Sequence, residues 1–403
     1  MDFKLTKKST EGLVLLVFIL ISFPLNFIYS YFNAIGFLPD LPLIGYPLFI
    51  HLSSFFIIII FLKNFNGEIS KHFYNFVFIA FIVNCIVYTL VGYFISEYSG
   101  NLDSFSQSAI FLYYLVIYTI ASFYFFNFII SYNRIFLYLL LIFSLIVVLN
   151  YIQTGNYIFT LGSLSDDDSN LTYQHVSLIF FLTWFFHFFL EKNIYLRLLS
   201  VLIIFTLLIF SGARSEFFGF LISFLFYLVY LFFNIPRINL YKTLINIFVI
   251  LIVIFLSKNF VLEIFENSRH FNVVDLQSDN SWYERKQLQE INLREIKENF
   301  IFGSYASHFN IGRGSYIHNI LSTWQQYGLI GFILFIILVF APFFYSLRKI
   351  LKSMNSYEQA LFFISTYCLI MVLVVKSIFW PYIGIMFGLY LFVLKTNKPI
   401  VRG

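Results

Sequence analysis

The stretch LLIFSGARSEFFGFLI, residues 207–222, places an arginine and a glutamate inside an apolar run that extends from residue 198 to residue 233. An arginine at the centre of a bilayer costs at least about 2.5–3.5 kcal/mol. Either the run is two membrane spans joined at SGARSE, or the charges are buried for a function. We expect both, with a turn at the membrane surface that presents Arg214 and Glu216.

Composition extends this interpretation to the whole chain. The 403 residues are 60% hydrophobic and 11% charged, whereas soluble domains carry about 25% charged residues. Repeated apolar runs of this length predict an all-α, polytopic membrane helix bundle that forms a single transmembrane domain over residues 1–403. Cys85 and Cys368 both lie inside apolar runs, which predicts neither a disulfide nor a metal site. The first apolar run is long and lacks a clear cleavage site, so we expect it to remain as a helix.

About twelve spans fit the pattern of apolar runs, each near the ~20 residues that a bilayer requires. They cover residues 12–31, 43–62, 73–95, 108–131, 134–153, 172–190, 194–212, 215–233, 240–257, 321–345, 357–376 and 379–394. With a cytoplasmic N-terminus, 16 of the 25 Lys and Arg residues fall on the cytoplasmic side, and the outer side holds 15 of the 20 acids. The positive-inside rule therefore predicts that both termini are cytoplasmic.

The predicted connection from residue 257 to residue 319 is much longer than any other, and it lies on the outer, periplasmic side. Long structured loops are usually functional, which puts the expected function on this face. Within it, Ser281 and Glu284 form a capping-box pattern that predicts an amphipathic helix near 281–299. Its apolar face is predicted to carry Trp282, Leu288, Ile291 and Ile296, and its charged face Lys286, Glu290, Arg294, Lys297 and Glu298. Arg285 projects onto the apolar face, either to snorkel at the interface or to aim a positive charge inward.

The segment FGSYASHFNIGRGSYIHNILSTWQQYGLIG, residues 302–331, follows this helix. Gly303, Gly312 and Gly314 permit tight turns in it. His318 and Asn319 stand at the outer mouth of the tenth predicted span, where a histidine is commonly only a cap or interface residue. Gln325 and Gln326 lie within that span, and we expect them to face protein or a water-filled cavity.

Arg214, Arg285, Arg313 and His318 all fall on the predicted outer side. Arginine binds phosphate oxygens through a planar fork and keeps its charge, and histidine serves as a general base near neutral pH. Together they predict a site for a phosphate ester at the lipid surface. Arg214 alone would also fit a turn residue that faces lipid headgroups, and Glu216 is predicted to be its structural partner. The run Asp166–Asp168 is not expected to bind a metal, because three consecutive acids on a loop do not converge on one ion.

A span ending in SGARSEFFGF, a large outer loop, and SYIHNILSTWQQYGLIGF opening the next span resemble the bacterial O-antigen polymerase and O-antigen ligase superfamily. The motifs cover residues 198–345, and Ala213 stands where the family has a serine before the arginine. The resemblance implies a metal-independent glycosyltransferase without a cofactor. It would act on undecaprenyl-diphosphate-linked oligosaccharide at the outer leaflet of the bacterial inner membrane. By the same resemblance Arg214 and Arg285 clamp the donor diphosphate, with Arg313 as a further candidate ligand. His318 activates the acceptor hydroxyl, and Glu216 and Asn319 support the site.

Three activities remain open from the sequence. A polymerase would extend O-antigen or capsular polysaccharide, a ligase would transfer the chain to lipid A core, and a flippase would move the lipid-linked unit without chemistry. The charged residues avoid mid-span positions and gather on one face, which argues against transport. We favour the polymerase, with a chain-length regulator and a flippase in the same membrane as candidate partners and no nucleic-acid partner.

Overall fold

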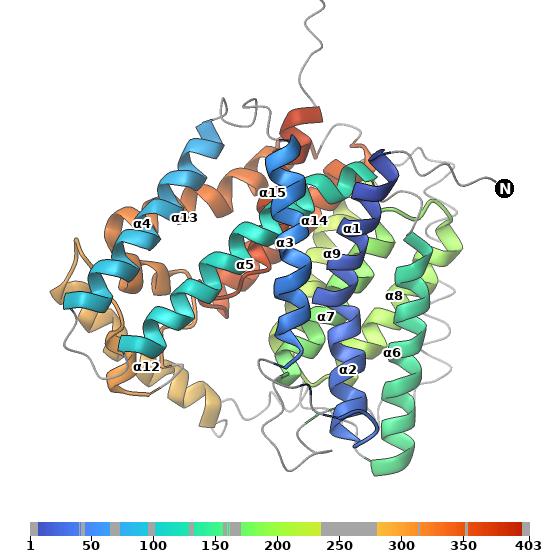
Figure 1. Ribbon diagram of the computed structural model, residues 1–403, viewed down its shortest axis with the longest axis horizontal. Helices are drawn as coiled ribbons and strands as arrows, with labels where there is room; N and C mark the ends of the chain where they lie inside the picture. The colour runs from blue at the N-terminus through green and yellow to red at the C-terminus, as the bar shows by residue number, and fades with distance from the viewer. Residues whose placement is uncertain are drawn as a thin grey trace, which may run out of the picture. The chain divides into compact units, whose positions relative to one another are not determined.

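The described part of the chain is helical. The structure is a computed structural model that describes residues 7–39, 41, 45–64, 73–95, 101–128, 133–155, 159, 161, 171–234, 280–312, 315–350 and 354–396. Within these ranges it contains helices and no strand (Figure 1). The helices are α1 (Lys7–Ser22), α2 (Pro24–Ala34), α3 (Pro47–Asn64), α4 (Phe73–Ile95), α5 (Asn101–Phe128), α6 (Asn133–Thr154), α7 (Tyr173–Phe188), α8 (Ile194–Phe210), α9 (Arg214–Asn234), α12 (Asn280–Glu298), η5 (Ser307–Asn310), α13 (Leu321–Leu347), α14 (Ser356–Val374) and α15 (Ile383–Thr396).

Among the described residues, eight helical segments are long and apolar enough to cross a membrane, which indicates a helical, multi-pass membrane protein. Eleven of the twelve predicted spans coincide with described helices, and the ninth, 240–257, lies outside the described residues. Helices α7, α8 and α15 have 16, 17 and 14 residues, fewer than the ~20 of a straight span. The first predicted span is interrupted at Phe23, because Pro24 starts a second helix and has no N–H to donate.

The turn predicted at SGARSE is confirmed. Helix α8 ends at Phe210, and α9 begins at Arg214. Gly212 adopts a φ of 68°, which suits a residue without a Cβ. Its N–H donates to the Ile209 carbonyl at 3.2 Å, closing the end of α8 as in a Schellman motif. The apolar run is therefore two helices, with the charges at the start of the second.

The chain divides into two compact units, and each is described by itself. Unit 1 comprises 1–55, 128–274 and 349–360, and unit 2 comprises 56–127, 275–348 and 361–403. In unit 1, α6, α7 and α8 lie side by side (Figure 1). Trp184 of α7 is fully buried and contacts Phe188 and Phe220. Such large apolar side chains fill the interior of this unit.

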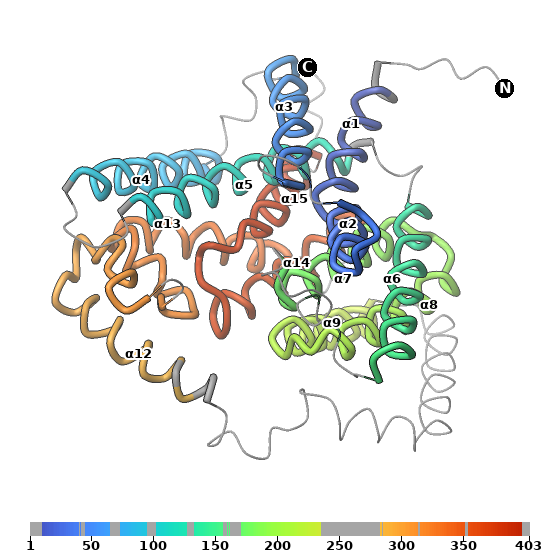
Figure 2. The backbone as a smooth tube through the Cα atoms, turned by 60° about the horizontal axis from the view of Figure 1, so that its bottom comes forward, coloured from blue at the N-terminus to red at the C-terminus, as the bar shows by residue number. Residues whose placement is uncertain are grey.

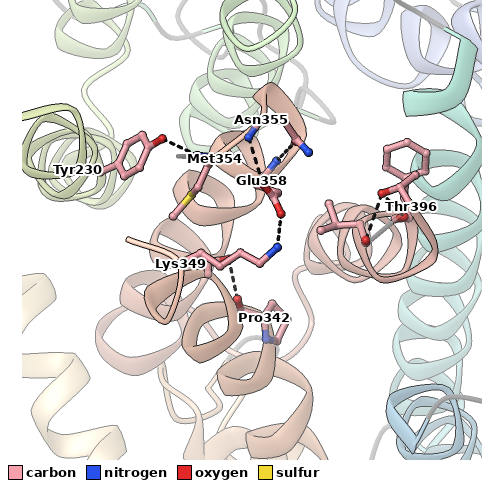
Figure 3. Close-up of polar contacts among 10 residues, drawn as sticks. Tyr230, Pro342, Lys349, Met354, Asn355, Glu358 and Thr396 are labelled. Atoms are coloured by element: carbon pink, nitrogen blue, oxygen red, sulfur yellow. Dashed lines mark hydrogen bonds and ion pairs between the residues drawn. The ribbon is translucent and has the colours of Figure 1, made fainter. Parts of the chain in front are cut away.

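Polar contacts in unit 1 cluster at helix ends. Figure 3 shows the Lys349–Glu358 ion pair and a capping box at the start of α14, in which Asn355 and Glu358 each accept the other's backbone N–H. The Tyr230 hydroxyl of α9 accepts the Met354 N–H at 3.1 Å. The Asn234 amide donates to the Ile350 carbonyl at 2.5 Å. These contacts fix Ile350 and Met354 to the end of α9.

Some contacts within unit 1 join segments that the predicted alternation of spans places on the same side of the membrane. The 349–358 segment and the end of α9 are both predicted to be cytoplasmic, as are Asn133 and Glu191, whose side chains are hydrogen-bonded at 3.0 Å. Phe159 donates to Phe210 in unit 1, both on the predicted outer side. The twelve spans, their alternation and the absolute orientation stay predictions.

Unit 2 is built on close approaches of helices. Helix α4 packs against α13, and the Tyr74 hydroxyl donates to the Leu338 carbonyl at 2.9 Å. Gly388 of α15 lets α5 come so near that an added Cβ would lie 2.0 Å from the Ser122 hydroxyl oxygen. Small residues at such contacts are typical of helix packing in membranes.

Helix α13 is broken near its start, at Tyr327 and Gly328. Gly328 has φ 67° and ψ −177°, a conformation that is essentially restricted to glycine. An added Cβ would lie 2.4 Å from the Tyr88 hydroxyl oxygen and 2.8 Å from the Ile301 carbonyl oxygen. The break separates a short first segment of α13 from the long apolar segment. It also lets the 301–304 turn lie against α13 at Gly328.

We expect Gly328→Ala to lower the free energy of unfolding in detergent by more than the ~1–3 kcal/mol that backbone strain alone would cost. The overlap of the added Cβ with Tyr88 and Ile301 adds to that strain. Gly36 is the matched control, since its φ is 73° and no atom lies within 4 Å of an added Cβ. Gly36→Ala should cost only ~1–2 kcal/mol. Equal losses of stability in the two variants would contradict the close packing at Gly328.

Candidate active site at the start of helix α13

Where the sequence predicts an amphipathic helix near 281–299, the structure has helix α12, Asn280–Glu298, which lies against α13 (Figure 2). The five residues predicted on its charged face are exposed. On the other face Ile296 is buried as expected, but Ile291 is 44% exposed. Asn292, with no exposed surface, takes the buried position instead. The predicted apolar face was wrong at Ile291. The hydrogen bonds of the neighbouring Asn292 anchor the helix with Asn292 turned inward instead.

That anchor is a buried hydrogen-bond network between α12, η5 and α13. The Gln325 amide donates to the Asn292 side chain, to Glu295 Oε2 at 3.0 Å and to Ser307 Oγ at 3.2 Å. The Ser307 hydroxyl donates to the same carboxylate oxygen at 2.5 Å. Asn292 also donates to the Ser315 carbonyl at 3.2 Å. These hydrogen bonds hold the loop on the helix, although Gln325 Oε1 is buried without a hydrogen-bond partner within the described residues.

Gln326 orients a buried histidine, His308, which has no exposed surface. Gln326 Oε1 accepts the Ala306 N–H at 3.1 Å, so its amide NH₂ donates to His308 Nδ1 at 2.7 Å. The neutral imidazole therefore carries its proton on Nε2. Within the described residues His308 Nε2 has no hydrogen-bond partner. Gln325 and Gln326 both face protein. This is one of the two surroundings, protein or a water-filled cavity, that the sequence predicted for them.

The backbone before His308 is strained. Ala306 has φ 66°, the one positive φ of a non-glycine residue within the described ranges. A left-handed alanine costs about 1–2 kcal/mol, and the Gln326 hydrogen bond to its N–H helps to hold it. Strained residues of this kind cluster at functional sites, and here the strain sets the start of η5 and so the position of His308.

Burial lowers the pKa of His308 from its ordinary 6.5 to about 4. Between these values the unfolded chain binds a proton that the folded chain does not. The stability that His308 contributes is thus complete above pH 6.5 and is lost as the pH falls toward 4, with a slope of at most about 1.4 kcal/mol per pH unit. We expect His308→Gln to flatten the decline of unfolding free energy between pH 6.5 and pH 4.5. An unchanged slope in denaturant titrations would contradict this assignment.

His318 lies three residues before α13, at the position the sequence predicted. Burial, together with the positive charges of Arg285 and Lys376, lowers its pKa from the ordinary 6.5 to about 4. The imidazole is therefore neutral at pH 7 and able to accept a proton. Within the described residues neither His318 nor Arg285 has a hydrogen bond or an ion pair. A neutral base thus stands beside two cations.

The Tyr316 ring packs between His318 and its aromatic neighbours. The Tyr316 ring lies 5.2 Å from that of His318, 5.5 Å from that of His308 and 5.4 Å from that of Phe379, measured between centroids. Burial raises the pKa of Tyr316, so its hydroxyl stays protonated at neutral pH. The turn that carries Phe379 is held to α13, because the Ser322 hydroxyl accepts the Ile378 N–H at 2.9 Å.

Of the predicted site residues, the structure brings Arg285 and His318 together in unit 2. Asn319 has a local role, since its side chain accepts the Leu321 N–H at 2.9 Å at the start of α13. Arg214 and Glu216 belong to unit 1, where Glu216 is buried and accepts the Ser215 hydroxyl at 2.5 Å. Their place in a common site with His318 stays a prediction.

Other predictions fall outside the described residues. Arg313, Gly314 and the run Asp166–Asp168 are among them, as are the side chains of Ser281, Trp282 and Glu284. The proposed capping box and the role of Arg313 therefore stay predictions.

Sequence reasoning missed two residues of this cluster. Lys376 was counted only as an outer base, although an ionisable residue at the end of an apolar run, as in LIMVLVVK at 369–376, is itself a functional signal. His308 lies in YASHFN, residues 305–310, where nothing local distinguishes it from a surface residue. Only the pairing with Gln326, eighteen residues on, shows that it is buried.

The fold defines a helical, multi-pass membrane protein, and the cluster on it joins a neutral histidine to two cations. Comparison of the chain with protein-family models, with curated proteins and with solved structures finds no match.

Proposed function

We propose that this protein is a membrane glycosyltransferase of the O-antigen polymerase type. It would join undecaprenyl-diphosphate-linked oligosaccharide repeat units into O-antigen or capsular polysaccharide. The observation that carries the proposal is the pairing of His318, neutral and without a hydrogen bond within the described residues, with Arg285 beside it. A proton acceptor next to a guanidinium is what the transfer of a sugar from a diphosphate to a hydroxyl requires.

In this reaction the acceptor hydroxyl oxygen attacks the anomeric carbon of the donor sugar. The bond from that carbon to the diphosphate oxygen breaks, and the diphosphate leaves with the electron pair. His318 takes the hydroxyl proton, and Arg285 stabilises the charge that develops on the leaving group. Attack opposite the leaving group inverts the anomeric centre. Arg214 and Arg313 are further candidate ligands of the diphosphate.

The proposal includes a location. It requires twelve spans in a bacterial inner membrane, cytoplasmic termini, and a periplasmic loop, 257–319, that carries α12 and η5. The excess of Lys and Arg on the predicted cytoplasmic side supports this orientation. A chain-length regulator and a flippase in the same membrane are the candidate partners.

Two other activities remain as alternatives. A ligase would use the same donor and the same cluster, with lipid A core as the acceptor. A flippase would need ionisable residues along a central path. The two cations that act on His318 instead lie on α12 and on the turn before α15, which favours chemistry over transport.

The test uses purified protein in lipid vesicles supplied with lipid-linked repeat units from the source strain. A ladder of products on a gel, formed without lipid A core, is expected of a polymerase. Transfer that appears only when lipid A core is added would replace the polymerase with the ligase. The absence of transfer with either acceptor would contradict both and reopen the flippase.

A further inference from the structure

Three consecutive apolar side chains are exposed directly after α12, at residues 300–302, which we name the apolar turn. Phe300 is 52% exposed, Ile301 59% and Phe302 74%. A run of large apolar side chains that stays exposed together marks a surface that binds a partner, because contact with water disfavours it. The apolar turn therefore calls for a cover that is itself apolar.

The backbone of the apolar turn is hydrogen-bonded to α13. The Phe300 carbonyl accepts the Trp324 Nε1–H at 2.7 Å, and the Ile301 carbonyl accepts the Leu329 N–H at 2.9 Å. The Trp324 ring also packs against the rings of Phe300 and Phe332, each at 4.8 Å between centroids. Two carbonyls that could not stay unpaired in an apolar environment are thus satisfied by the protein itself.

The apolar turn lies beside α4 and not beyond its end. The Tyr88 hydroxyl of α4 and the Ile301 carbonyl both come so close to Gly328 that either would overlap a Cβ added there. Tyr88 is six residues before Phe94, where the candidate membrane span of α4 ends, which is about 9 Å along the helix. The apolar turn is therefore level with the last turns of a membrane-spanning helix.

The exposed apolar surfaces of α4 and α13 reach the same level within unit 2. On α4 the exposed side chains recur every three or four residues along one stripe, at Val83, Ile86, Val87, Leu90, Val91 and Phe94. Helix α13 packs against α4 (Figure 1) and exposes Ile330, next to the Leu329 that binds the apolar turn, and Ile333. Both helices are long and apolar enough to cross a membrane, so we expect these side chains to face lipid. The apolar turn continues that surface.

We propose that the apolar turn inserts into the bilayer at its interface with water, where Phe300, Ile301 and Phe302 contact the acyl chains just below the lipid headgroups. The exposed Lys297 lies one helical turn before Ile301, so its ammonium group can reach the headgroup phosphates from there. Tryptophan, here Trp324, is enriched at this depth of a bilayer. The insertion anchors α12 and the start of α13 at the membrane surface, and it does not depend on the proposed glycosyl transfer.

The test measures what surrounds residue 302 in the full chain reconstituted into phospholipid vesicles. Phe302→Cys carries a thiol-linked fluorophore, which is quenched either by lipids with brominated acyl chains or by iodide in the water. The substitution suits an exposed side chain, and Cys85 and Cys368 are buried, so the unsubstituted protein measures their small background of labelling. We expect strong quenching by bromine near the headgroup end of the acyl chains and protection from iodide.

Two reference positions calibrate this result. Val91→Cys places the label on the exposed stripe of α4 and defines quenching by lipid. Glu290→Cys places it on α12, on the face opposite the buried Asn292, and defines quenching by iodide. Ile301→Cys repeats the measurement at a second position of the apolar turn. The labels at 301 and 302 should both be quenched by brominated lipid at least as strongly as the label at 91.

Three results would overturn the proposal. Labels at 301 and 302 that iodide quenches as strongly as the label at 290 would place the apolar turn in water. Labels shielded from both quenchers would show that protein covers it, either a second copy of the chain or another partner. Val83 lies about 12 Å further along the α4 stripe than Val91, and a turn quenched like a label at Val83→Cys, mainly by bromine near the chain ends, would lie too deep for the interface.

Discussion

His318→Ala is expected to reduce the rate of sugar transfer by about 100- to 10,000-fold, the usual contribution of a positioned general base. The physical reason is that the imidazole is neutral at pH 7, because burial and two adjacent cations keep its pKa near 4. The measurement is the initial rate of product formation in vesicles at saturating donor.

Two controls make this result specific. His175→Ala removes an exposed histidine at the start of α7, which is hydrogen-bonded to Thr172, and should leave the rate unchanged. The wild-type rate should also stay level from pH 7 down to about pH 5 and fall only near pH 4, where His318 gains its proton. A rate that halves at the ordinary histidine pKa, 6.5, would contradict the assignment of His318 as the base.

Arg285→Ala is the second large effect, with an expected loss of about 100- to 1,000-fold in transfer, as for removal of a preset donor to a developing negative charge. Arg285→Lys should recover only part of the rate, because an ammonium keeps the charge but loses the bidentate fork. The same assay measures both, and gel filtration checks that α12 remains docked. A rate within threefold of the wild type in Arg285→Ala would remove this residue from the site.

Arg294 is the matched control for that change. It lies on the same helix, α12, but on the exposed face. Arg294→Ala removes the same charge from the same loop and should leave transfer close to the wild-type rate. A comparable loss in both variants would indicate that the net charge of the loop matters rather than the guanidinium beside His318.

The positions of the helices could be predicted because hydropathy is a local property of the chain. The turn at SGARSE, the bounds of α12 and the start of α13 after His318 all follow from patterns within about twenty residues. The break at Phe23 could also have been read from Pro24. The break at Gly328 was not predicted, because it depends on contacts with Tyr88 and Ile301 that no local pattern encodes.

The site was predicted only in part, for the same reason. Arg285 was identified because it is a charged residue on the predicted apolar face of a helix. His318 was identified because it lies at the mouth of a predicted span. Lys376 is more than fifty residues from His318 in sequence, and only the fold of unit 2 brings their charges together. The anchor at Asn292 was missed because hydrophobic periodicity treats a polar residue as exposed, whereas this one is bonded to Gln325 and buried.

The central claim is that the cluster around His318 performs glycosyl transfer. The most direct measurement counts the undecaprenyl diphosphate released by purified protein in vesicles together with the glycosidic bonds formed. The account predicts one diphosphate released per bond in the wild type, and neither product in His318→Ala, although that variant inserts and folds normally. Bond formation that continues undiminished in His318→Ala, or lipid-linked units that cross the bilayer without any diphosphate release, would contradict it.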